Sequence, residues 1–412
     1  MGTPYRNPAS FARGVCLMPP FSTILGGLRP RKKVAVLCVF PLHFLESFGA
    51  RFNPVGHYAT WLPQIAESWQ SETEFEIHWL TGSDLVREPA TSREMNQTFH
   101  VYPIASKGRA TSLYSRDRRE IQKILGQIQP DFVHAWGTED VCGFAGVRSG
   151  YPCLLSMQGI HTNLIRYGLH HLRVYFQAAL EAYCLARAGW VTVESEWGRK
   201  KIQPFRMGRP VEILEYGVHP LFFDACWRPT AQTPTFLFVG TICPQKGIED
   251  CLAAFRDPRL AHARLEVFGS GNPRYLSALR QGSPPNVEWR GRQPPEKVAL
   301  ALEKASGLIL PTRADTSPNV VKEARVVGLP VITSPQGGQT TYMRNGEDGF
   351  LVPCHAISEL TSAIAQLSRN PEKVRAMGEA GKRRYREQLR AKVTAQAFLS
   401  LYRKIFSEFE GG

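Results

Sequence analysis

Residues 235–256 read TFLFVGTICPQKGIEDCLAAFR. A run of apolar residues ends at Gly240, a short polar loop follows, and an amphipathic stretch begins at Ile248. A strand that is apolar throughout and leads through a glycine into a helix is typical of a parallel sheet with helices on both faces. This stretch therefore predicts an α/β fold.

The same alternation of short apolar runs and helical stretches extends in both directions from this unit. The later strands are RLEVFG, NVEWRG, GLILP, LPVIT and FLVP, and the earlier ones are VAVLCVF, FEIHWL, DFVHAW, PCLLSM, WVTVE and VEILE. A chain of 412 residues is long enough for two such domains. We expect two facing, doubly wound Rossmann-like domains, residues 32–217 and 218–390. A flexible basic tail, 1–31, precedes them, and a C-terminal helix, 391–412, packs beside the second domain or crosses back to the first.

The composition indicates a globular chain with an excess of positive charge. It is 43% hydrophobic, and 50 Lys and Arg residues against 36 Asp and Glu give a formal charge of +14. The excess favours an anionic partner. Because it is spread over both halves and no nucleic-acid motif is recognised, we expect no nucleic-acid partner. The nine cysteines form no C-x-x-C pair, which is typical of buried thiols in a reducing cytosol.

Location is the next inference from composition. No stretch approaches the ~20 apolar residues that cross a bilayer, and we expect a cytoplasmic protein. Weak peripheral association with an anionic membrane, at its inner face, is a further hypothesis. It rests on residues 107–123, which are rich in Lys and Arg, and on 166–176, which mix basic and aromatic residues. A solvated helix face and a helix packed between sheet and solvent are the commoner explanations of such segments.

The loop after Gly240 has the features of a phosphate site. A glycine lets a ligand approach the backbone closely, and Lys246 lies near the start of a helix, whose free amides and dipole favour an anion. The alternative interpretation is an ordinary strand-to-helix turn, which also uses glycine.

A second loop of this kind lies in residues 310–324, LPTRADTSPNVVKEA. Ser317 is a suitable N-cap and Pro318 suits the first helical position. We therefore expect the amides of Asn319 and Val320 to lie unpaired at a helix N-terminus.

Two acids flank this helix start. Asp315 lies just before it and Glu323 lies on the helix, so both fit one site at the carboxyl ends of the strands, where open α/β sheets bind ligands. The alternative is an exposed acid and an ordinary helical glutamate. No D-x-D sequence occurs in the chain, and we expect neither a metal nor a cofactor.

Together these motifs resemble those of the retaining GT-B glycosyltransferases of family 4. FVGTICPQKGIEDCLAAF is similar to the family's phosphate loop, and Asp315 and Glu323 occupy the ends of its acid-x7-acid motif. EARVVGLPVITSPQGG and NGEDGFLVP resemble its downstream pattern, and PDFVHAWGTED, AGWVTVESEWGRK and VEILEYGVHPLFF resemble its acceptor-domain strands and interdomain entry. The resemblance covers about residues 33–390, most densely 236–353. It implies an active site in the cleft between two domains.

The resemblance implies a role for each matched residue. Lys246 binds the donor diphosphate, Asp315 contacts the donor sugar and Glu323 bonds the nucleotide ribose. A departing nucleoside diphosphate develops negative charge, which an ammonium group and helix-terminal amides can stabilise without a metal. The implied donor-binding set is Gly240, Thr241, Lys246, Asn319, Val320 and Glu323.

Three residues depart from the family pattern. Asp315 stands where glutamate is more usual, which shortens its reach. Thr241 stands where arginine is frequent, and Arg313 or Lys322 is expected to supply the missing phosphate contact. Gln158 stands where many relatives carry histidine. Because an amide cannot act as general base, we expect the diphosphate oxygen to take the acceptor proton. The expected catalytic set is Asp315, Lys246 and Gln158.

The acceptor is expected at loops that follow strands of the first domain. Glu139 is expected at a helix start there. His57 and His161 are also compatible with solvated surface positions, whereas His134, inside an apolar strand, is more typical of a satisfied core histidine. The expected acceptor-side set is Gly56, His57, Glu139 and Gln158.

These expectations combine into one function and one alternative. We expect a retaining glycosyltransferase that moves a sugar from a nucleotide-diphosphate sugar to a hydroxyl of a carbohydrate or lipid-linked acceptor. Its broad role would be polysaccharide or glycoconjugate assembly. The alternative is a GT-B protein that binds nucleotide sugars without turnover.

Overall fold

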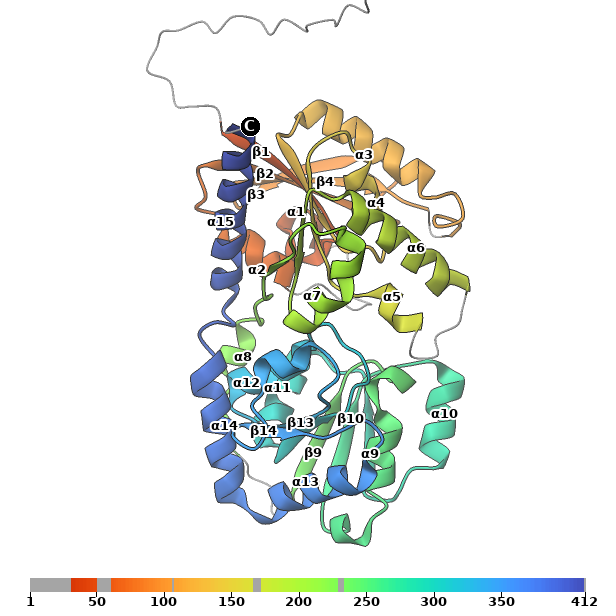
Figure 1. Ribbon diagram of the computed structural model, residues 1–412, viewed down its shortest axis with the longest axis vertical. Coiled ribbons are helices and arrows are strands. Elements are labelled where there is room, and N and C mark those ends of the chain that lie inside the picture. The colour runs from red at the N-terminus through yellow and green to blue at the C-terminus, as the bar shows by residue number, and fades with distance from the viewer. Residues whose placement is uncertain (1–30, 50–60, 106, 166–171, 229–232, 411–412) are drawn as a thin grey trace, which may run out of the picture. The chain divides into compact units, whose positions relative to one another are not determined.

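The computed structural model describes residues 31–49, 61–105, 107–165, 172–228 and 233–410. These residues form two α/β domains, each built on a largely parallel sheet with helices on both faces (Figure 1). The predicted α/β class and the pair of Rossmann-like domains are confirmed. The predicted basic tail, apart from Arg31, lies outside the described residues.

The first sheet has eight strands in the order β3-β4-β2-β1-β5-β6-β7-β8. All neighbouring pairs are parallel except β3 with β4. Every strand that the apolar runs predict in this half is present. The strands are β1 (Lys32–Leu37), β2 (Phe75–Ser83), β3 (Ala90–Glu94), β4 (Gln97–Pro103), β5 (Phe132–Trp136), β6 (Cys153–Ser156), β7 (Trp190–Val193) and β8 (Glu212–Ile213).

The β3–β4 hairpin is the element of this sheet that the apolar runs do not predict. Its strands lie at the sheet edge and mix polar with apolar residues, as an antiparallel edge with one solvated face does. Met95 and Asn96 join them with φ angles of 52° and 57°. Two positive φ angles are the conformation of a type I′ turn, which favours Asn. Asn96 was therefore the available signal.

The helices of the first domain agree with the amphipathic stretches, with one shift. The helix expected from Glu139 begins at Val141, because the Asp140 side chain accepts from the Val141 amide and caps it. The helices are α1 (Glu46–Gly49), α2 (Trp61–Ser68), α3 (Ser115–Ile128), α4 (Val141–Val147), α5 (His161–Leu164), α6 (Leu172–Arg187) and α7 (Glu196–Ile202).

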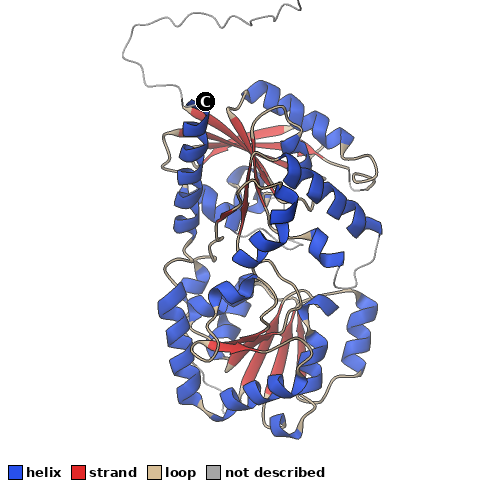
Figure 2. Cartoon of the chain, viewed as in Figure 1, coloured by secondary structure: helices blue, strands red, loops and turns tan. Residues whose placement is uncertain are grey.

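The second sheet has six strands, all parallel, in the order β11-β10-β9-β12-β13-β14. Helices surround this sheet (Figure 2). The strand order reverses between β9 and β12, which makes their carboxyl ends the topological switch point where such sheets bind ligands. The strands are β9 (Thr235–Val239), β10 (Arg264–Phe268), β11 (Val287–Gly291), β12 (Gly307–Leu310), β13 (Val331–Thr333) and β14 (Gly349–Leu351).

The remaining helices follow Val218, where the chain enters the second domain. They confirm the helical stretches that the sequence predicts, including the helical C-terminal region. The helices are α8 (Leu221–Asp224), α9 (Ile248–Ala254), α10 (Pro273–Gln281), α11 (Pro295–Lys304), α12 (Asn319–Val327), α13 (Ile357–Arg369), α14 (Pro371–Tyr385) and α15 (Ala391–Glu410).

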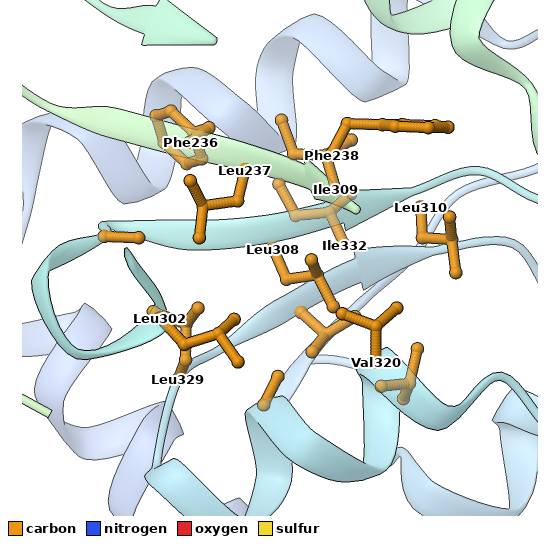
Figure 3. Packing of buried hydrophobic residues seen from close by; sticks show 14 of the residues in the cluster. Phe236, Leu237, Phe238, Leu302, Leu308, Ile309, Leu310, Val320, Leu329 and Ile332 are labelled. Carbon is orange, nitrogen blue, oxygen red and sulfur yellow. The ribbon is translucent and has the colours of Figure 1, made fainter. Parts of the chain in front are cut away.

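The core of the second domain fixes the two strands of the switch point. Phe236, Leu237 and Phe238 of β9 alternate between the faces of the sheet, and Leu308 and Ile309 of β12 join them in one cluster (Figure 3). Each of these side chains is at most 1% exposed. The loops after β9 and β12 therefore start from positions fixed by dense packing.

The C-terminal helix α15 packs on the first domain (Figure 1). Phe398, Tyr402 and Phe406 are buried in one cluster with β1 and β5. The Trp69 indole N–H also donates to the Ala395 carbonyl at 3.0 Å. The chain thus returns to the first domain after completing the second.

The two segments that connect the domains lie side by side. Tyr216 belongs to the core of the first domain and Val218 to the core of the second. The Val218 amide donates to the Leu389 carbonyl at 2.8 Å, and Thr394 Oγ1 donates to the Glu215 carbonyl at 2.7 Å. The two connecting segments are therefore joined to each other by hydrogen bonds.

Candidate active site

Lys246 and Asp315 meet at the switch point of the second sheet. Lys246 ends the short 3-10 turn that follows β9, and Asp315 lies in the loop after β12. The Lys246 ammonium donates to Asp315 Oδ2, and both side chains remain partly exposed. Two sequence-predicted residues 69 positions apart are thus one ion pair.

Hydrogen bonds to backbone carbonyls hold the two loops together. The Arg313 amide donates to the Gln245 carbonyl at 2.8 Å, and Gln245 Nε2 donates to the Ala314 carbonyl at 2.5 Å. Because these bonds involve the neighbours of Lys246 and Asp315, the ion pair is positioned by the loops themselves.

Gly240 presents open backbone at the end of β9, in the loop that leads to Lys246. Its φ of 151° lies in the region that favours glycine. No atom lies within 4 Å of the position that a Cβ would occupy, so the space in front of it is empty. Thr241, the next residue, is exposed. The geometry fits the expectation that a ligand can approach the backbone here.

The start of α12 differs from the sequence prediction in its cap. Pro318, not Ser317, is the N-cap, and Ser317 Oγ is hydrogen-bonded to the Tyr342 hydroxyl at 2.9 Å. The prediction of a serine cap is wrong because Tyr342 provides a buried partner for the hydroxyl. The amides of Asn319 and Val320 find no acceptor among the described residues.

Glu323 lies on the first turns of α12. It is partly buried and no hydrogen-bond partner for its carboxylate lies among the described residues. Burial raises the pKa of this carboxyl to about 7, although the charge of Lys322 opposes the rise. A carboxylate that is half removed from water and unpaired can accept hydrogen bonds from ligand hydroxyls.

Both proposed substitutes for the missing arginine have partners within the protein. Arg313 donates to the Pro244 carbonyl at 2.7 Å and to Asp250 Oδ1 at 3.3 Å. Lys322 is fully buried and donates to Glu194 Oε2 at 2.8 Å. The prediction for Lys322 is wrong, because its ammonium is buried against Glu194. The phosphate contact by Arg313, whose side chain is partly exposed, stays a prediction.

Lys322 instead connects α12 to the first domain. Its ammonium bonds Glu194, directly after β7, and the Tyr216 carbonyl at 3.0 Å. Ser195 Oγ also donates to the Thr316 carbonyl at 2.7 Å. The sequence predicted no role for Glu194 or Ser195. A charged residue directly after the strand WVTV was the available signal.

Glu139 and Gln158 come together on the first domain, at the ends of β5 and β6. Glu139 Oε1 accepts from the Gly159 amide at 2.6 Å. Gln158 Oε1 lies 3.3 Å from the point where a Cβ on Gly137 would sit, and Glu139 Oε2 lies closer still. These two acceptor-side predictions therefore share one location, near the switch point between β1 and β5.

The two histidines of this region are both buried. His134 is 0% exposed, with Nδ1 at 2.6 Å from the Tyr402 hydroxyl and Nε2 at 2.7 Å from Ser156 Oγ, which confirms it as a core histidine. His161 is also buried, so its alternative interpretation as a solvated surface group is wrong. Its ring lies beside the buried carboxylate of Glu181, which the sequence did not single out.

The remaining acceptor-side residues, Gly56 and His57, lie outside the described residues. The same holds for residues 166–171 of the segment considered for membrane contact.

The second domain matches a model of a known protein family. Residues 233–370 match the family model described as "Glycosyl transferases group 1". This segment contains the Gly240 loop, Lys246, Asp315 and Glu323.

Curated relatives match over part of their length. A D-inositol 3-phosphate glycosyltransferase of Segniliparus rotundus is 33% identical over 153 residues, which cover 35% of this chain and 34% of the relative. An uncharacterized glycosyltransferase of Methanocaldococcus jannaschii is 28% identical over 148 residues, which cover 35% of this chain and 41% of the relative. The matched segment thus spans well under half of either protein.

Solved structures match over nearly the whole fold. Sucrose-phosphate synthase from Thermosynechococcus elongatus superposes with a TM-score of 0.75 at 18% identity, covering 92% of this chain and 100% of that one. The Anabaena protein HepE in complex with UDP-glucose gives a TM-score of 0.67 at 12% identity, covering 90% and 99%. At such identities the similarity establishes the GT-B fold alone.

Proposed function

We propose that this chain, whose residues 233–370 belong to the glycosyl transferases group 1, transfers a sugar from a nucleoside-diphosphate sugar to an acceptor hydroxyl with retention of configuration. The acceptor is a carbohydrate or a lipid-linked sugar, in polysaccharide or glycoconjugate assembly. No divalent metal and no cofactor takes part.

One observation carries this proposal: the ion pair of Lys246 with Asp315 at the switch point of the second sheet. Gly240, in the same loop as Lys246, presents open backbone, and α12, which follows Asp315 in the chain, has two first amides without an acceptor among the described residues. An ammonium group and preorganised amides stabilise the negative charge that a leaving diphosphate develops. This is the chemistry that transfer from a sugar nucleotide requires.

The unpaired carboxylate of Glu323 supports a nucleotide at the same site. In the proposed complex it accepts hydrogen bonds from the ribose hydroxyls, while Asp315 exchanges Lys246 for a hydroxyl of the donor sugar. The complex of HepE with UDP-glucose is one example of this fold with a nucleotide sugar, which makes such a donor a reasonable choice here.

The proposed reaction balances without a protein base. The bond between the anomeric carbon and the diphosphate oxygen breaks, and a bond to the acceptor oxygen forms on the same face of the sugar. The leaving diphosphate oxygen takes the acceptor proton, because the amide of Gln158 cannot take it. Lys246 stabilises the charge on the diphosphate, and Asp315 and Gln158 orient the two sugars.

A panel of nucleotide sugars tests the proposal most directly. A UDP-, GDP- or ADP-sugar at ~100 times its dissociation constant is expected to stabilise the protein by ~2.7 kcal/mol in thermal unfolding. The product linkage, read by NMR, is expected to keep the anomeric configuration of the donor. A nucleotide-sugar shift without transfer to any acceptor would instead favour a binding protein without turnover. Loss of activity in EDTA with recovery in manganese would contradict metal independence.

Weak peripheral binding to an anionic membrane is the second part of the proposal. In the described residues no helix combines the length and the apolar character that a membrane crossing needs. Leu113 and Leu172 are 43% and 89% exposed, and exposed basic residues such as Arg116 and Arg119 lie near Leu113 in sequence. Exposed apolar groups beside positive charge suit a lipid surface at the cytoplasmic face. If the fraction of protein that co-sediments with vesicles does not depend on their anionic lipid content, the proposed membrane binding is contradicted.

A further inference from the structure

The backbone that follows Asp315 is held by both domains. Within the second domain, the Gly338 amide donates to the Asp315 carbonyl at 2.8 Å. The next carbonyl, that of Thr316, accepts from Ser195 Oγ at 2.7 Å, and Ser195 lies two positions after β7 of the first domain. Ser195 and Thr316 are both buried. Because these two carbonyls directly follow the Asp315 Cα, the two bonds restrict the backbone from which its carboxylate projects.

The Ser195 hydroxyl lies in a narrow space between two glycines. A Cβ on Gly338 would lie 2.6 Å from Ser195 Oγ and 1.7 Å from the Thr316 carbonyl oxygen, and a Cβ on Gly198 would lie 3.3 Å from Ser195 Oγ. The Gly198 amide donates to Ser195 Oγ at 3.2 Å. A hydroxyl has one hydrogen to donate, and here the Thr316 carbonyl accepts it. This contact between the domains therefore depends on a small side chain with a hydroxyl.

The preceding residue, Glu194, contacts the helix that carries the second acid. Lys322 Nζ, on α12, donates to Glu194 Oε2 at 2.8 Å and to the Tyr216 carbonyl at 3.0 Å. The side chains of Lys322 and Glu194 are both buried. Lys322 directly precedes Glu323 in the chain. Because breaking a buried ion pair is strongly destabilising, the turn of α12 that carries Glu323 is held against the first domain.

Two consecutive residues of the first domain thus contact both segments that carry the acids. Among the described residues, the acids have no side-chain bond of their own to the first domain, since Asp315 bonds Lys246 and Glu323 has no partner. Their positions relative to the first domain therefore rest on the contacts of Glu194 and Ser195. Such contacts matter for chemistry, because a displacement of ~1 Å at a reacting group can lower a rate about 10²-fold.

We propose that Glu194 and Ser195 are positioning residues of the donor site, through which the first domain sets the geometry of Asp315 and Glu323. Ser195 acts through the peptide that follows Asp315, and Glu194 acts through the lysine that precedes Glu323. The groups that bind the donor in the second domain are then placed correctly only with the first domain in contact. This inference rests on the proposed function for the roles of the two acids, whereas the contacts themselves do not depend on it.

Hydrogen exchange tests the positioning role without turnover. In Ser195→Ala of the full chain, the amides of residues 314–324 are expected to exchange faster than in the parent protein, because the loop loses its bond to the first domain. Ser149→Ala is the matched control. The buried Ser149 hydroxyl also donates to a carbonyl, that of Gly146 at 2.8 Å, and accepts from an amide, but all within the first domain. The control is expected to leave exchange in 314–324 unchanged.

Kinetics and calorimetry separate the two positioning residues. Because Asp315 is proposed to contact the donor sugar, Ser195→Ala is expected to lower kcat about 10-fold, without changing the affinity for the sugar-free diphosphate, UDP, GDP or ADP, of the best donor. Because Glu323 is proposed to bind the ribose, Glu194→Gln is expected to weaken binding of that diphosphate several-fold. Asp117→Asn, which changes another buried carboxylate of an ion pair, within the first domain, is expected to do neither. A merely structural role would lower stability and leave both constants as in the controls.

Two results would overturn the inference. One is equal exchange of residues 314–324 in Ser195→Ala and Ser149→Ala, and the other is an equal kcat in these two variants of an active enzyme. Where Ser195→Ala fails to fold, Gly338→Ala takes its place, because the added Cβ displaces the Thr316 carbonyl from the same hydroxyl. A failure of the proposed function is distinct, because no nucleotide sugar would then stabilise the parent protein, while the faster exchange in Ser195→Ala would persist.

Discussion

The proposed donor side and the proposed acceptor side of this protein are built in different ways. On the donor side, Lys246, Asp315 and Glu323 come from two contiguous segments, each a strand, a loop and a helix. On the acceptor side, Glu139, Gln158, His161 and Glu181 come from two strand ends and two separate helices. A site made of contiguous segments leaves a pattern in the sequence, whereas one assembled in space does not.

Their electrostatics differ as well. The proposed donor side combines an ammonium group, an open backbone segment and amides without an acceptor among the described residues, which suits an anion. The acceptor side has two carboxylates around one imidazole, which suits neutral hydroxyl groups. Between the two sides, Lys322 bonds Glu194 in a fully buried ion pair. Changes at each place should therefore have separable effects.

The largest effect is expected from the ion pair between the sides. Lys322→Met leaves the carboxylate of Glu194 buried without its partner, which typically costs about 3–5 kcal/mol. The first thermal unfolding transition is expected to fall clearly below that of Lys304→Met, which changes an exposed lysine of the same domain. The double variant Glu194→Gln, Lys322→Met is expected to recover part of the loss. Equal stability of Lys322→Met and Lys304→Met would mean that the two sides do not depend on this contact.

The next largest effect is expected on the donor side. Lys246→Ala removes the ammonium group that we propose stabilises the leaving diphosphate, and the expected loss is about 10²–10³ in kcat, as for one preorganised electrostatic group. Lys297→Ala, at an exposed position of α11, is the control and should keep full activity. Steady-state kinetics with the best donor of the panel measures both. An unchanged kcat in Lys246→Ala would show that Lys246 takes no part in the chemical step.

The sequence predicted the contiguous segments of the second domain well and the spatially assembled residues of the first domain poorly. The apolar runs predicted all strands of the second sheet, and the resemblance to a known family implied that Lys246 and Asp315 serve one donor site. The apolar runs missed β3 and β4, because an edge hairpin lacks a continuous apolar run. They also missed Glu181, which looks like any glutamate of an amphipathic helix. Only the fold reveals that it is buried and receives the His161 and Thr162 amides.

A smaller effect is expected from the titration of Glu323. Burial raises the pKa of this carboxyl to about 7, so the ionised form, which is the one proposed to accept ribose hydrogen bonds, dominates above pH 7 and is lost as the pH falls through 7. Affinity for the nucleotide sugar is expected to drop several-fold from pH 8 to pH 6. Glu323→Gln should bind about 10-fold more weakly at pH 8, as loss of one charge-assisted hydrogen bond implies, and should show no such pH dependence. Calorimetric titration at three pH values decides; a pH dependence that survives in Glu323→Gln would point to another group.

The smallest effect is a loss of folding stability at low pH, which is expected in the first domain more than in the second. The described histidines that are buried, His78, His134 and His161, all lie in the first domain. Burial lowers the pKa of His134 to about 3, from an ordinary value of about 6.5. Between pH 6.5 and pH 3, His134 is therefore protonated in the unfolded chain and neutral in the folded protein. The stability due to neutral His134 is complete above pH 6.5 and is lost progressively as the pH falls towards 3, by about 1.4 kcal/mol per pH unit.

His134→Gln isolates this contribution, because the other histidines titrate equally in both proteins. The variant should be less stable than the parent at pH 8, since the bonds to Tyr402 and Ser156 are altered. At pH 5.5 the difference in urea unfolding should shrink by about 1.4 kcal/mol. Because Tyr402 belongs to α15, acid should also loosen the attachment of that helix and unfold the first domain before the second. A stability difference that is the same at both pH values would show that His134 is protonated in the folded protein.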